Sequence, residues 1–175
     1  MCSLKLCENV FGSSAGDAIR SALATVAERS FFALVDACDE THFAELAASH
    51  EQWLEAAVRF DEPSCAGELS CTLPVALATQ LFAAFGGIDP DGPPPESEEL
   101  FDLIGEFVNM ICGAWLTRAA GHQVFRLGGP VVTPRAGAEW MRAAIAAPGL
   151  MAAIDDLPFV IELRAGTAPS RTASV

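Results

Sequence analysis

One apolar stretch of the sequence, LFDLIGEFVNMICGAWL at residues 100–116, carries three polar side chains that could do chemistry. Asp102, Glu106 and Asn109 supply two carboxylates and one amide, and Gly113 follows four residues after the amide. A helix turns by about 100° per residue, so these four positions fall within about 60° of one another. The other positions are mainly apolar. The pattern therefore predicts an amphipathic helix with a wide core face and one narrow polar stripe.

Each polar residue of this stripe has an ordinary interpretation beside a functional one. Asp102 and Glu106 could simply face solvent, as charged residues on a helix surface usually do. Asn109 is harder to explain in that way, because asparagine is a poor helix former in the middle of a helix. Its amide has both donor and acceptor atoms, so it could hold a water molecule or hydrogen-bond within a buried interface.

Composition and charge limit the classes of partner. The chain has 175 residues, of which 51% are hydrophobic and 19% charged, which indicates a folded domain with a hydrophobic core. Its formal net charge is −13. That balance argues against nucleic acid and against an anionic membrane surface, because both attract basic proteins.

One uncharged run, residues 69–88, is as long as a membrane span. Ser70, Pro74, Gln80 and a Gly-Gly pair interrupt it, so we expect a strand end followed by a short buried helix, and no membrane span. The N-terminus lacks the apolar region of a secretory signal. We therefore expect a cytoplasmic protein.

Metal and redox chemistry have little support in the sequence. The six cysteines show no CxxC spacing, and His42, His50 and His122 are scattered through expected loops. Zinc or redox sites need ligands at closer intervals. We expect reduced cysteines, as in a cytoplasm, and neither a metal nor any other cofactor bound by this chain.

The elements that must position the stripe follow from hydrophobic periodicity and turn residues. Their order predicts an α+β fold, a single domain over residues 1–164 with a mainly antiparallel sheet covered by helices, and a mobile tail over 165–175. Residues 41–52 are ambiguous between a loop and a short helical turn. Ser97 is the expected cap of the stripe helix. We expect helices at 17–32, 75–85, 97–120 and 136–147, strands at 31–39 and 157–165, a hairpin of 52–60 with 68–73, and strand, kink and strand at 123–134.

The pattern Asp102-x3-Glu106-x2-Asn109, with Gly113 after it, resembles the signature helix of the CheC/CheX family of chemotaxis response-regulator phosphatases. RFDEPSCAGELSCTLPVALATQLFAAFGG resembles the strand–turn–strand–helix unit that precedes this helix in the family, and FRLGGPVVTP resembles the strand that follows. The resemblance covers about residues 50–135. A single copy of the motif is the CheX-like arrangement, which the resemblance links to a homodimer.

The resemblance implies a substrate and a role for each residue of the stripe. The substrate would be the aspartyl phosphate of a receiver domain, which holds its own magnesium. Asn109 would hold the attacking water, and Glu106 would dock onto a lysine of the receiver. Asp102 would contact the same partner, and the glycines at 105 and 113 would let its backbone approach closely.

Two classes of function remain from the sequence. The first is a phosphatase that acts on a phosphorylated response regulator in chemotaxis or related two-component signalling. The second is a binding module that docks a receiver domain or a flagellar switch component without hydrolysis. Asn109 favours the phosphatase, because docking alone does not require it.

Overall fold

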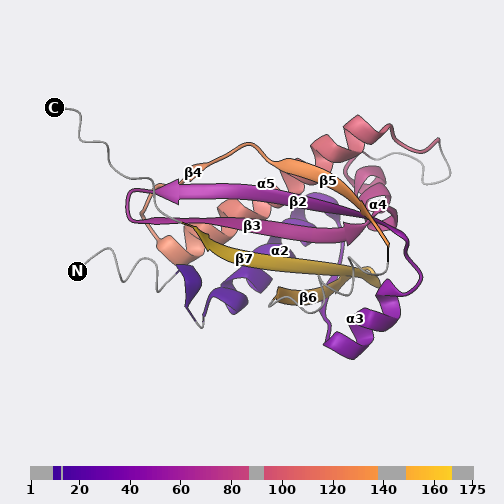
Figure 1. Ribbon diagram of the computed structural model, residues 1–175, viewed down its shortest axis with the longest axis horizontal. Helices are drawn as coiled ribbons and strands as arrows, with labels where there is room; N and C mark the ends of the chain where they lie inside the picture. The colour runs from indigo at the N-terminus through magenta and orange to yellow at the C-terminus, as the bar shows by residue number, and fades with distance from the viewer. Residues whose placement is uncertain (1–9, 13, 87–92, 138–148, 167–175) are drawn as a thin grey trace.

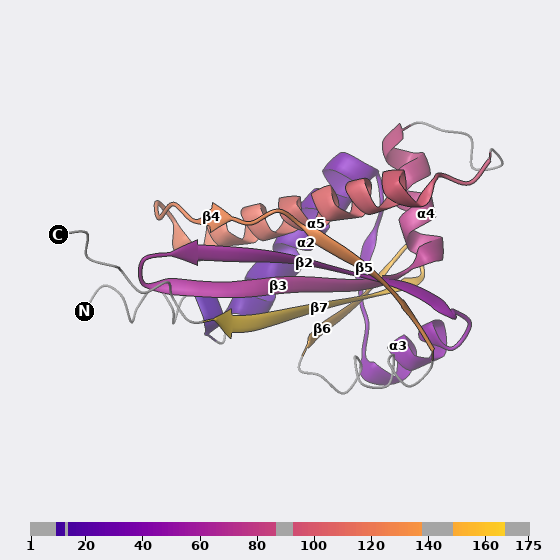
Figure 2. The same cartoon turned by 45° about the horizontal axis from the view of Figure 1, so that its top comes forward.

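The computed structural model describes residues 10–12, 14–86, 93–137 and 149–166. Within these ranges, a seven-stranded antiparallel sheet has α2, α4 and α5 on one face and α3 on the other (Figure 1; Figure 2). The strand order is β1-β6-β7-β3-β2-β4, and β5 also pairs with β2. This arrangement confirms the expected α+β fold. The elements are α2 (Ala15–Phe31), β1 (Val35–Ala37), α3 (Glu40–Ala47), β2 (Gln52–Glu62), β3 (Cys65–Pro74), α4 (Val75–Gly86), α5 (Ser97–Ala120), β4 (Arg126–Leu127), β5 (Val131–Ala136), β6 (Gly149–Ile154) and β7 (Leu157–Gly166).

The β2–β3 hairpin is the centre of the sheet and confirms the expected strand pair. Its strands pair from Trp53 with Pro74 to Glu62 with Cys65. Leu54 and Phe60 of β2 are buried under the helices, whereas Arg59 between buried neighbours points to the opposite face. The alternation of apolar and polar residues therefore fixes which side of the hairpin the helices cover.

In the N-terminal part of the chain, the expected boundary between the first helix and the first strand is corrected. The sequence predicts this strand at 31–39. In the structure, Phe31 is the last residue of α2, and only Val35–Ala37 form a strand. Phe31 is fully buried against the core, which keeps it in the helix. The ambiguous stretch after it forms α3, whose first turn is capped by the carboxylate of Asp39 accepting from the backbone N–H of His42.

The C-terminal part contains a strand that the sequence did not predict. β6 pairs with β7 and with β1, so it lies inside the sheet between them. The β6–β7 turn consists of Asp155 and Asp156, which both have positive φ, as a tight hairpin requires. Most of the helix expected at 136–147 lies outside the described residues, and Ala136 belongs to β5. β7 extends to Gly166, two residues beyond the expected end of the domain.

The helix that carries the stripe, α5, begins as a capped helix and packs along the sheet. Glu96, and not Ser97, is the cap: its carboxylate and that of Glu99 form a reciprocal capping box. By length and composition α5 could cross a membrane, but half of its most apolar 18-residue stretch is buried inside the domain. It is therefore placed here as a core helix.

Candidate functional site

The polar stripe of α5 lies on the side of the helix that is turned away from the core. Asp102 and Glu106 are exposed and Asn109 is half-buried. On the opposite side, Phe107 and Ile111 are fully buried. The sequence pattern thus placed the polar groups and the core face correctly, and a partner can reach the stripe.

Aromatic contacts fix the rotation of α5 and hence the direction of the stripe. Phe107 packs edge-on against Phe31 of α2 and Phe159 of β7, with ring centroids 4.7 and 5.9 Å apart. Two turns later, Trp115 packs edge-on against Phe60 of β2 at 5.3 Å. Because these contacts hold the helix at two levels, the stripe residues are carried on a rigid support.

Glu106 and Asn109 contact each other in this structure. The Asn109 amide nitrogen Nδ2 donates a hydrogen bond to Glu106 Oε2 over 3.4 Å. Among the residues that the structure describes, it is the one hydrogen bond that either side chain makes. The amide oxygen of Asn109 and the second carboxylate oxygen of Glu106 are therefore left for water or a partner.

The glycines of the stripe differ from each other, and the expectation for Gly105 is corrected. Gly105 is buried, and a Cβ built on it would lie 3.0 Å from Cγ of Pro130. The close approach at this position is made by the chain's own Pro130, so it does not serve a partner's backbone. A Cβ on Gly113 would meet only Leu127 Cδ1, at 4.0 Å, so this glycine remains open to a partner.

The β4–β5 connection beside the stripe is the part of the site that the sequence did not assign. Gly128, Gly129 and Pro130 are exposed next to α5. The backbone N–H of Gly128 donates to the carbonyl of Arg59 in β2 over 2.8 Å, which fixes the start of the connection. The Gly-Gly-Pro run marked a kink in the sequence, but nothing in it showed that Pro130 would contact Gly105.

A separate hollow of about 460 Å³ lies over the ends of β2, β3, β4 and β7, and no stripe residue is among those that line it. Two of its arginines are paired with carboxylates of neighbouring strands. Arg59 Nε lies 3.1 Å from Glu68 Oε2, and Arg126 Nη2 lies 2.7 Å from Asp61 Oδ2. These pairs leave little excess charge to select an anion. The stripe itself stands on an exposed helix surface outside this hollow, a shape that suits a macromolecular partner better than an enclosed small substrate.

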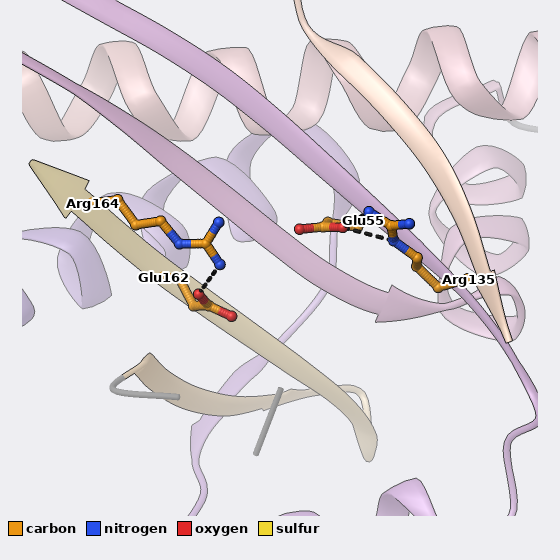
Figure 3. Close-up of polar contacts among 4 residues, drawn as sticks. All are labelled: Glu55, Arg135, Glu162 and Arg164. Atoms are coloured by element: carbon orange, nitrogen blue, oxygen red, sulfur yellow. Dashed lines mark hydrogen bonds and ion pairs between the residues drawn. The ribbon is translucent and has the colours of Figure 1, made fainter. Parts of the chain in front are cut away.

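The sheet face away from α5 carries two further ion pairs, which Figure 3 shows. Arg135 Nη2 of β5 lies 2.7 Å from Glu55 Oε2, and Arg164 Nη2 of β7 lies 2.5 Å from Glu162 Oε2. The hydrogen bond and the charge of Glu162 raise the pKa of Arg164 above its ordinary value. Side chains of this face thus neutralise one another, between strands for Arg135 and within β7 for Arg164, whereas Asp102 and Glu106 on α5 form no ion pair among the described residues.

Metal ligands and reactive thiols do not gather at the stripe. Within the described ranges, no group of three or more histidine, cysteine, aspartate or glutamate residues is arranged to hold a metal ion. Cys71 and Cys112 are free and buried. Burial raises the pKa of the Cys112 thiol to about 12, and burial followed by the nearby Cys112 raises the pKa of Cys71 well above its ordinary value. Both therefore remain neutral thiols in the core.

The chain is similar to known proteins in its fold, whereas comparison of its sequence finds no match. No protein-family model matches the chain, and no curated protein matches it. Solved structures do. Chemotaxis protein CheX from Vibrio vulnificus is 18% identical, with a TM-score of 0.61 over 86% of this chain and 95% of that one. FliY from Thermotoga maritima is 12% identical, with a TM-score of 0.57 over 92% of this chain and 90% of that one.

A third solved structure contains a partner. It is the complex of CheX with CheY, BeF₃ and Mg²⁺ from Borrelia burgdorferi. It is 12% identical, with a TM-score of 0.53 over 86% of this chain and 97% of that one. At these identities the likeness concerns the fold, and it extends over most of each chain. The chain therefore has a CheC/CheX-like fold.

Proposed function

We propose that this protein is a phosphatase that hydrolyses the aspartyl phosphate of a response-regulator receiver domain. The observation that carries the proposal is the exposed Glu106–Asn109 pair on the outward side of α5, within a CheC/CheX-like fold. The pair stands on the outward side of a helix that packs firmly on the core, where another protein can reach it. Its residue types match those that the reaction needs.

The reaction itself asks for positioning more than for covalent chemistry. An aspartyl phosphate is a reactive mixed anhydride, and a water oxygen attacks its phosphorus while the bond from phosphorus to the aspartate oxygen breaks. The aspartate leaves as a carboxylate, and the water proton goes to the released phosphate. The magnesium of the receiver belongs to the substrate and stabilises the charge, so this chain needs to supply a well-placed water.

Asn109 and Glu106 suit different parts of this task. The free amide oxygen of Asn109 can accept a hydrogen bond from the attacking water without adding negative charge near the phosphoryl group. Glu106 is better suited to bind a cation of the receiver, because a carboxylate aimed at a phosphoryl group would be repelled. Asp102 and Gly113 lie on the same stripe and would complete the contact.

The partner class is supported by the Borrelia burgdorferi complex, in which a CheX of similar fold is bound to CheY. We propose a phosphorylated receiver as partner, a cytoplasmic location, and the homodimer that the resemblance implies. We also propose that no metal or other cofactor is held by this chain. Sedimentation of the purified protein over a range of concentrations measures the oligomeric state directly.

The decisive test is single-turnover loss of label from a phosphorylated receiver of the same organism. Wild-type protein should accelerate the loss above the receiver's own rate. Asn109→Ala should bind the receiver nearly as well but slow hydrolysis at saturating enzyme by roughly 100-fold, the size expected for loss of one positioning group. Glu45→Gln in α3 is the control for this assay, because it removes an exposed negative charge on the opposite face of the sheet, away from the proposed pair and from α5.

Two outcomes would overturn the proposal. If wild type and Asn109→Ala accelerate the loss equally, Asn109 does not hold the attacking water. If wild type binds the phosphorylated receiver without accelerating the loss, the protein is a docking module and not a phosphatase.

A further inference from the structure

The hydrogen bond between Glu106 and Asn109 defines which atom of the amide faces a partner. Nδ2 of Asn109 points at Glu106 Oε2 over 3.4 Å. The amide group is planar, so its oxygen is directed away from Glu106. An asparagine without this contact could present either its NH₂ group or its oxygen, because the two ends of the amide have nearly the same shape.

Only one of these two orientations suits a water that must attack an electrophile. The attacking oxygen needs a lone pair free for phosphorus, so the positioning group should accept a hydrogen bond from the water. The amide oxygen can do so, whereas the NH₂ group would donate to the lone pair that is required for attack. The contact with Glu106 selects the orientation with the oxygen free.

Glu106 can make this contact and bind a partner at the same time. A carboxylate has two oxygens with about four acceptor positions in total. Oε2 receives the hydrogen bond from Asn109, and Glu106 is otherwise exposed. A cation of the partner can therefore bind Oε1 without breaking the contact with the amide.

We propose that Glu106 is a positioning residue for Asn109, in addition to its role in docking. This inference rests on the proposed function for its effect on catalysis, but the orientation of the amide is a property of the free protein. Glu106 holds the amide with its oxygen outward before the receiver arrives. Removing the carboxylate then lowers the rate of the chemical step as well as the affinity.

The first experiment needs no partner. Nuclear magnetic relaxation of the Asn109 side-chain NH₂ group should show a restricted group in wild type and in the matched control Glu98→Gln. In Glu106→Ala the order parameter should fall toward the flexible range, below about 0.6. Equal order parameters in wild type and Glu106→Ala would overturn the inference, whether or not the protein is a phosphatase.

The second experiment separates positioning from docking by kinetics at saturating and at limiting protein. Glu106→Gln keeps an acceptor oxygen at the same reach but loses the charge, so it should weaken binding and stay within about threefold of the wild-type saturating rate. Glu106→Ala should lower that saturating rate by about 10- to 100-fold. The double variant with Asn109→Ala should be no slower at saturation than Asn109→Ala alone, because Glu106 acts through the amide.

The outcomes distinguish the two proposals. The positioning role would be overturned if the rate losses of the two single variants multiplied in the double variant. It would also be overturned if Glu106→Ala kept the wild-type saturating rate. In both cases the proposed phosphatase activity would still stand. An absence of hydrolysis by wild type, together with a restricted Asn109 amide that depends on Glu106, would overturn the proposed phosphatase while the orientation of the amide still stood.

Discussion

At the scale of single residues, the two glycines of α5 have different physical roles. Gly105 is required by contact, because Pro130 lies where its side chain would be. Gly113 has open space in this structure, with Leu127 only at van der Waals distance. A glycine inside a helix costs about 1 kcal/mol relative to alanine. A position that bears this cost without a contact that requires it is a candidate for a role in binding.

Replacing these glycines by alanine tests that difference. Gly113→Ala should raise the free energy of unfolding by about 0.5–1 kcal/mol, because the helix gains propensity and nothing is displaced. Gly105→Ala should gain less or lose stability, since the new Cβ would lie 3.0 Å from a ring carbon of Pro130. Urea unfolding measures both. A larger gain for Gly105→Ala than for Gly113→Ala would contradict the packing of the β4–β5 connection on α5.

At the scale of elements, α5 links the sheet to α2 and so determines how the stripe is presented. Phe107 lies between Phe31 of α2 and Phe159 of β7. Near the end of the helix, Arg118 donates hydrogen bonds to the hydroxyls of Ser21 and Thr25 in α2. The apolar contact lies in the core and the polar one at the surface, so the first should dominate the stability of this arrangement.

Truncating the central aromatic contact should therefore be costly. Phe107→Ala should lower the free energy of unfolding by about 3–5 kcal/mol, the cost of a large cavity in a core. Asn109→Ala, two positions away on the other side of the helix, should change it by less than about 0.5 kcal/mol. Chemical denaturation compares the two variants. Similar losses in both would show that the stripe, and not only the core face, supports the fold.

At the scale of the whole molecule, the net charge of −13 is unevenly distributed over the surface. Three arginines on the far side of the sheet are paired with carboxylates of neighbouring strands, and a fourth, Arg164, is paired with Glu162 of its own strand β7. The N-terminal half of α5 instead exposes several carboxylates, namely Glu98, Glu99, Asp102 and Glu106. A surface of one sign attracts an oppositely charged partner over a distance set by the ionic strength.

Association with a receiver should accordingly depend on salt. On the proposed function, the rate of association should fall severalfold between about 10 mM and 150 mM salt, because screening shortens the range of attraction. Stopped-flow mixing with a labelled receiver measures this rate. Asp102→Asn should weaken the salt dependence, whereas Arg135→Gln on the far face should leave it unchanged. A rate independent of salt would show that α5 does not steer the partner.

The sequence by itself determined the features that depend on local periodicity. The alternation in β2 and β3 indicated a hairpin with one apolar face, and the spacing in α5 placed Glu106 and Asn109 on one accessible stripe opposite the core. These predictions succeeded because side-chain direction repeats every two residues in a strand and about every 3.6 residues in a helix. Neighbours along the chain carry all the information that such patterns need.

Only the tertiary structure decided the features that depend on distant partners. β6 has the sequence GLMAAI, which lacks strand alternation, and it is a strand because β1 and β7 pair with it on both sides. Gly105 meets Pro130 across 25 positions of sequence, so its role changed from a partner contact to internal packing. The hydrogen bond that orients Asn109 depends on rotamers that periodicity does not specify. Pairing and packing are selected by burial over the whole chain, which no local pattern contains.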